Sequence, residues 1–224
     1  MVVYQSKKNM NRVLALVFSL ILFTANSQAS ISFLIQGDLL KDSAGNAMAQ
    51  SGLVLFVSST ADAIFDGITA GSATSIGSSL NVGDDRVVFK TDLSSFGTNG
   101  VLDLTTGALN LSSVTGWNTG DPLGLLWFPT LTAASTTIPA GTQYGFYTNA
   151  NAVDGTQAWV TPTDPTNNYR LGFFTKDGVE LSPGSGAANS ASAGNASLTV
   201  APEPSRSMLG LIGFGMLALR RHRR

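Results

Sequence analysis

Carboxylates are the side chains of this sequence with the most chemistry to offer. Residues 30–201 contain 12 aspartates and one glutamate, Glu180, whereas the only histidine of the chain is His222 and cysteine is absent. A Ser-His-Asp or Cys-His catalytic site therefore cannot be assembled in this region, and metals held by histidine or cysteine are not expected there. Two carboxylates would suffice for glycoside hydrolysis, but most of these aspartates stand beside Gly, Ser, Asn or Pro, where turns favour them.

Two stretches are candidates for binding calcium, which prefers oxygen ligands. One is the pair Asp84 and Asp85, and the other is the loop 149–155. The loop offers three oxygen-bearing side chains, but Val153 stands where an alternating set of ligands would place another oxygen. These three are Asn149, Asn151 and Asp154. The sequence requires no cofactor, and calcium remains an option.

Tryptophans offer a second kind of binding site. Trp117 lies in the turn-rich stretch 115–120, and Trp159 lies shortly before Pro162. Either indole could present a flat face to a sugar ring, and packing in or at the rim of the core is the alternative. Trp127, inside the apolar run 124–128, is expected in the core.

Short strands must position these residues, because Gly, Pro and Asn turns separate the apolar runs. The run 53–57 suits a strand buried on both faces, and 60–68 is expected to form a short helical turn. The segment 183–194 has the composition of a loop or flexible linker. We expect one all-β domain over residues 30–200, an antiparallel β-sandwich, jelly-roll-like or Ig-like, with long Gly/Ser-rich loops. Its strands are expected at 31–36, 53–57, 87–90, 101–104, 124–128, 143–148, 157–161, 169–175 with 179–181, and 197–200.

The first 29 residues have the composition of a signal peptide. Lys7, Lys8 and Arg12 precede the apolar run 13–23, and a small-x-small motif ends at Ala29. This pattern predicts a signal helix, export through the secretion machinery and cleavage after Ala29, with an uncleaved anchor as the alternative.

The charge of the remaining body differs from that of the whole chain. The whole chain has a net charge of −1, whereas residues 30–201 have 13 acidic and five basic residues, a net charge of −8. Such a body lacks the basic surface that nucleic-acid binding needs. Anionic lipid would repel it, so any membrane association must come from the terminal segments.

The last 24 residues, 201–224, have their own organisation. The triplet Pro202-Glu203-Pro204 precedes the apolar run 208–219, and a basic cluster follows. A helix of 12 residues is about 18 Å long, short of the roughly 30 Å hydrocarbon core of a bilayer. A weak transmembrane anchor is one interpretation, and a processed sorting signal is the other. The basic cluster contains Arg220, Arg221, Arg223 and Arg224.

This triplet, glycine-containing apolar helix and arginine cluster, in that order, resemble the PEP-CTERM sorting signal of bacterial exported proteins. The resemblance covers residues 201–224 alone. It implies recognition by an exosortase, a membrane processing enzyme, cleavage near the triplet and transfer of the body to another surface molecule. The membrane would then hold the protein only before processing.

The leading hypothesis is a non-enzymatic protein of the cell surface or of an exopolysaccharide (biofilm) matrix, with a structural or adhesive β domain. A carbohydrate-binding module that uses exposed aromatics, with or without calcium, is the alternative. An envelope glycosidase or lyase is the least favoured class, because catalytic groups are so scarce.

Overall fold

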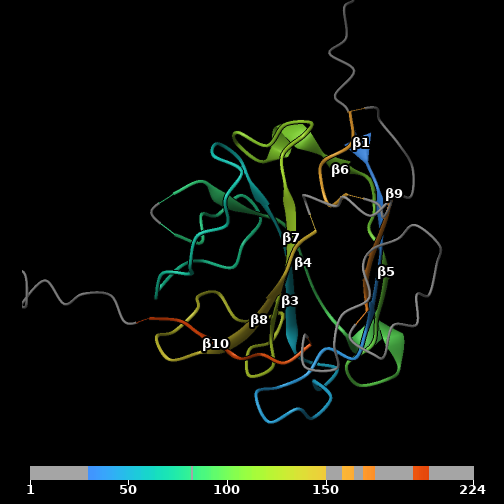
Figure 1. Cartoon of the computed structure of the whole chain (residues 1–224), viewed down its shortest axis with the longest axis vertical. Coiled ribbons are helices and arrows are strands. Elements are labelled where there is room, and N and C mark those ends of the chain that lie inside the picture. Colours follow the sequence, from blue (N-terminus) through green and yellow to red (C-terminus); the bar gives the residue numbers. More distant parts are fainter. Residues whose placement is uncertain (1–29, 82, 150–157, 164–168, 175–193, 202–224) are drawn as a thin grey trace, which may run out of the picture.

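The computed structural model describes residues 30–81, 83–149, 158–163, 169–174 and 194–201 (Figure 1). This part of the chain is mostly strands, with two single-turn 3-10 helices, η1 (Ser94–Phe96) and η2 (Leu111–Ser113). The described residues therefore confirm an all-β protein. None of their helices has the length and apolar character to cross a membrane. The expected signal helix, the sorting helix and most of the segment 183–194 lie outside the described residues.

The larger sheet has five strands in the order β10-β8-β7-β3-β4, all antiparallel. Its central strands β3 and β7 are buried along their whole length. The expectation that 53–57 is covered on both faces is thus confirmed, and the strand continues to Ser59. The strands are β3 (Leu53–Ser59), β4 (Asp85–Asp92), β7 (Leu123–Phe128), β8 (Gln143–Tyr147) and β10 (Leu198–Thr199).

The smaller sheet has three strands in the order β5-β2-β9. β2 (Phe33–Asp38) pairs antiparallel with β5 (Leu102–Thr105) but parallel with β9 (Tyr169–Phe174). The expectation of a purely antiparallel fold is wrong for this pair. Parallel neighbours need a long connection, and more than 130 residues separate β2 from β9. A two-residue pair, β1 (Ser30–Ile31) with β6 (Leu109–Asn110), completes the strands.

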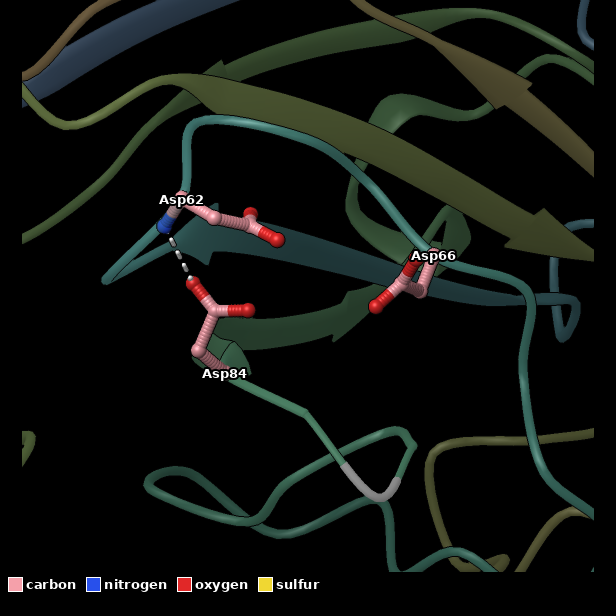
Figure 2. Close-up of side chains that lie close together, drawn as sticks. All are labelled: Asp62, Asp66 and Asp84. Carbon is pink, nitrogen blue, oxygen red and sulfur yellow. Dashed lines mark hydrogen bonds between the residues drawn. The ribbon is translucent and has the colours of Figure 1, made fainter.

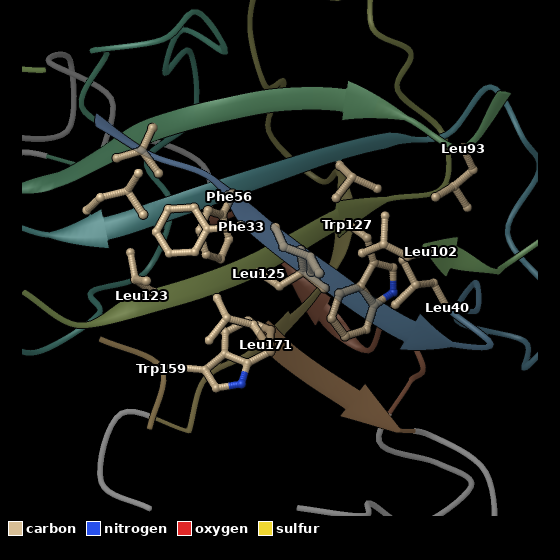
Figure 3. Packing of buried hydrophobic residues seen from close by; sticks show 14 of the residues in the cluster. Phe33, Leu40, Phe56, Leu93, Leu102, Leu123, Leu125, Trp127, Trp159 and Leu171 are labelled. Carbon is tan, nitrogen blue, oxygen red and sulfur yellow. The ribbon is translucent and has the colours of Figure 1, made fainter. Parts of the chain in front are cut away.

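One hydrophobic cluster lies between the two sheets (Figure 3). Phe33 and Ile35 of β2 alternate with the less buried Leu34 and enter this cluster, as the two-residue period of a strand requires. The ring of Phe33 meets that of Phe56 on β3 edge to face, with centroids 5.1 Å apart. Trp127 of β7 lies in the same cluster. The two sheets are therefore two layers around one core.

A second cluster covers the opposite face of the five-stranded sheet. Leu55, Val57, Leu126 and Phe128 point to this side. Loops rather than strands cover them, through Ile68, Leu80 and Ile138. β3 and β7 thus contribute to both clusters, which explains their continuous apolar sequence.

The expected helical turn at 60–68 is absent, and the segment is irregular. Carboxylates accept hydrogen bonds from backbone N–H groups of this segment. Asp84 accepts hydrogen bonds from the N–H groups of Ala61 and Asp62, and Asp62 accepts one from Ile64. Ala63 has a positive φ of 62°, which interrupts a right-handed helix.

The expected strand at 157–161 is also wrong for its described residues, 158–161. Only an isolated bridge between Val160 and Pro122 forms there. Trp159 is fully buried, so packing of its side chain takes the place of a strand ladder. The segment 179–181 lies outside the described residues.

Gly145 of β8 should be irreplaceable, because a Cβ atom there would lie 2.0 Å from ring carbons of Trp127. We expect Gly145→Ala to cost about 3 kcal/mol of unfolding free energy, the upper end for overpacking, or to prevent folding. Gly107→Ala is the matched control, since a Cβ atom there meets nothing within 4 Å. Urea denaturation measures both, and equal midpoints would contradict the packing described here.

Candidate acidic site

Three carboxylates converge beside the start of β4 (Figure 2). Asp62 and Asp66 come from the loop after β3, and Asp84 immediately precedes β4. One oxygen from each lies within 4.8 Å of the others. We call these three residues the acidic cluster.

Asp84 ties the loop after β3 to the start of β4. Its Oδ2 accepts hydrogen bonds from Asp62 N at 3.2 Å, from Ser59 Oγ at 3.2 Å and from Ala61 N. Burial by itself would raise the pKa of Asp84, but the hydrogen bonds from Ala61 and Asp62 outweigh it and hold the pKa below its ordinary value. Asp84 is therefore a structural anion that fixes the loop.

Asp85, the next residue, is only 2% exposed and belongs to the covered face of the sheet. Its Oδ2 accepts hydrogen bonds from Asp66 N at 2.8 Å and Asn81 Nδ2 at 2.7 Å. Its Oδ1 is buried without a hydrogen-bond partner among the described residues. Burial, together with the charges of Asp84 and Asp66, raises the pKa of Asp85 to about 6.

The acidic cluster has the donor type that a hard cation takes, because carboxylate oxygens are the usual ligands of calcium. No lysine or arginine of the described ranges forms an ion pair with these three carboxylates. Calcium takes six to eight oxygens, more than one oxygen from each of three carboxylates supplies. The cluster is a concentration of negative charge that could attract a cation.

Only one of the calcium candidates from the sequence is in this cluster. Asp84 belongs to it, and Asp85 lies beside it without joining it. Asn149 is elsewhere, where its carbonyl accepts a hydrogen bond from Trp159 N. Asn151 and Asp154 lie outside the described residues.

Sequence reasoning missed Asp62 and Asp66. Both stand in a segment that resembled a helical turn, and 18 residues separate Asp66 from Asp84. Their spacing from β3 carries no calcium-binding pattern. The meeting of the two loops comes from the pairing of β3 with β4, which places Ser59 opposite Asp85.

The two tryptophans proposed for carbohydrate contact do not face solvent. Trp117 is 3% exposed and donates from Nε1 to Thr161 Oγ1 at 2.8 Å. Trp159 is 0% exposed and meets the rings of Tyr147 and Phe56 edge to face. Both indoles fill the core between the two layers, as the packing interpretation expected, and neither presents an exposed face to a sugar.

A pocket of about 130 Å³ lies on the loop-covered face of the five-stranded sheet. Val57 and Leu126 of the central strands line it, with Phe146 of β8 and Leu198 of β10. No local pattern in the sequence predicts this pocket, because its walls come from segments far apart in the chain.

Comparisons with known protein families, with curated proteins and with solved structures find no match to this chain. Function is therefore inferred from the residues of this chain alone.

Replacing the carboxyl of Asp85 by an amide tests its buried charge. The folded-state pKa of about 6 exceeds the ordinary aspartate value of 3.8, so the folded protein binds more protons between these pH values. Through this group, the unfolding free energy falls as the pH rises from about 4 to about 6 and stays low above that. We expect Asp85→Asn to remove most of this pH-dependent fall in unfolding free energy. At pH 7, with EDTA present to remove divalent cations, we expect the variant to have a higher melting temperature than the wild type.

Asp42→Asn provides a contrast of opposite sign. Hydrogen bonds, first from the side chain of Asn46, lower the pKa of the exposed Asp42. Its ionised form therefore stabilises the fold above the unfolded pKa, and this contribution is lost as the pH falls through the folded pKa.

For Asp85→Asn, a melting temperature equal to that of the wild type at every pH would contradict the burial of the Asp85 charge.

Salt should relieve the repulsion within the acidic cluster. The Debye length falls from about 30 Å at 0.01 M to about 3 Å at 1 M salt. We expect the wild type to gain more stability over this range of NaCl than Asp66→Asn, which removes one of the three charges. Asp42→Asn, outside any described group of three carboxylates, should gain as much as the wild type. Equal increases in melting temperature with salt for all three proteins would rule out repulsion within the acidic cluster.

Proposed function

We propose that this is an exported bacterial protein of the cell surface or exopolysaccharide matrix, processed through a PEP-CTERM-type signal at residues 201–224. Its body is a non-catalytic structural or adhesive domain, a β-sandwich of jelly-roll-like or Ig-like kind. Its proposed partners are the secretion machinery, which exports it, and an exosortase-type enzyme, which processes its tail. The mature protein would lie among exopolysaccharide.

The position of the described body relative to the two proposed cleavage sites is the main support. The first strand residue, Ser30, pairs with Asn110 directly after the predicted cleavage at Ala29. At the other end, Ala201 bridges to Thr69 directly before Pro202. Removal of both terminal segments would thus leave all described strands in place. A protein processed at both ends needs this arrangement.

The chemistry of the body supports a structural role. Its apolar side chains form two cores that share one sheet, and its three tryptophans are buried between the layers. The body has a net charge of −8 and no histidine or cysteine. An acidic, closely packed domain suits a hydrated matrix, where charge keeps it soluble. The carbohydrate-binding alternative has lost the exposed aromatics on which it depended.

Changing Pro202-Glu203-Pro204 to three alanines tests the proposed processing. We expect the variant to keep its tail and to stay with the membrane fraction of the producing cells, whereas the wild type loses the tail. Intact-mass spectrometry of the purified protein shows whether the tail is still attached. Ser205→Ala with Ser207→Ala is the matched control next to the triplet and should be processed as the wild type. Normal processing of the triple alanine variant would overturn the proposal.

A further inference from the structure

The surface that the pocket beside β10 offers is mostly apolar. Its floor is formed by Val57 and Leu126, and Phe65, Ile68 and Phe146 stand around it. Two carboxylates, Asp66 and Asp85, also contribute to the lining. Asp85 is 2% exposed and its Oδ2 is already bonded to Asp66 N and Asn81 Nδ2, whereas Asp66 is exposed and belongs to the acidic cluster. An occupant would therefore meet mainly hydrocarbon, and a hydrophobic group suits the pocket better than a cation.

The rim of this pocket carries exposed apolar surface. Leu198 lines the pocket and is 44% exposed, one of three large hydrophobic side chains exposed to this degree among the described residues. Burying such a side chain is favourable because its apolar surface is removed from water. A hydrophobic occupant would recover part of this free energy.

The chain leaves the described body at this same rim. Ala201 is three positions after Leu198 and bridges to Thr69, the neighbour of the pocket residue Ile68. The next apolar segment of the chain, 208–219, begins only seven positions later. A fully extended chain of seven residues spans at most about 23–25 Å, which is long enough for the segment to return to the pocket.

We propose that the apolar segment 208–219 of the same chain docks on this pocket before processing, with Phe214 as its anchor. Phe214 is the only phenylalanine, tyrosine or tryptophan in residues 202–224, and Gly213 and Gly215 flank it. Glycines allow the backbone to approach a surface closely. An engineered apolar cavity of about 150 Å³ in another protein binds benzene, so a pocket of about 130 Å³ accepts one phenyl ring.

Docking would shield the sorting segment from water and from other chains between export and delivery to the membrane. It needs only that the tail be attached, and it does not rest on cleavage by an exosortase. A membrane competes for the same apolar segment, so docking and membrane insertion exclude each other.

Disulfide cross-linking tests the docked state, because the chain has no cysteine of its own. The full chain is exported in a host without a processing enzyme, so that its tail stays attached. One variant combines Leu198→Cys at the rim with Leu211→Cys, three positions before Phe214. The distance control combines Leu211→Cys with Ser112→Cys, an exposed position outside the pocket lining. We expect mild oxidation to cross-link the rim pair several-fold faster than the control pair.

Two further changes separate docking from mere tethering. Phe214→Ser removes the anchor without touching the body, and Gly67→Phe places a ring in the pocket at a glycine whose added Cβ atom has free space. Either change should lower the rate of the rim pair several-fold, to the rate that tethering alone gives two positions 13 residues apart, and Gly107→Phe should not. Equal rates for the two pairs, or a rim pair indifferent to Phe214→Ser, would overturn the proposal. Because no processing enzyme is present, these outcomes do not depend on the sorting signal.

Discussion

The burial of β3 and β7 on both faces is the constraint on which the rest of the structure depends. A sheet with two apolar faces needs two covers. The three-stranded sheet supplies one, through Phe33 and Ile35, and irregular loops supply the other, through Ile68, Leu80 and Ile138. A loop makes a good cover only where its backbone is held, because its N–H and C=O groups lack a ladder.

Carboxylates hold the backbone of the loop after β3 by accepting hydrogen bonds from its N–H groups. Asp84 and Asp85 stand side by side in sequence and bind different parts of the same loop, Asp84 through Ala61 and Asp62, and Asp85 through Asp66. The consequence is a local excess of negative charge and one buried carboxyl with a raised pKa. The positions of the Asp84 and Asp85 carboxylates thus follow from how the fold holds this loop.

The sequence predicted the strands well where a single segment carries the signal. The doubly buried run at 53–57 and the runs at 124–128 and 143–148 are strands because β-branched and aromatic residues stand between turns. It failed where a distant partner decides. The segment 60–68 is irregular, with a positive φ at Ala63, and it is tied to Asp84 from far along the chain. The burial of Trp117 and Trp159 depends on the two layers that close over them. The cluster and the pocket combine segments far apart in the chain, which no local pattern records.

The parallel pairing of β2 with β9 joins one of the first segments of the body to one of the last. β2 cannot gain this neighbour until the chain has been made at least to Phe174. Contacts of such long sequence separation slow folding, so the nascent chain stays without its complete smaller sheet during most of its synthesis. Until β9 is made, one edge of β2 stays open, with backbone N–H and C=O groups that another strand could pair with.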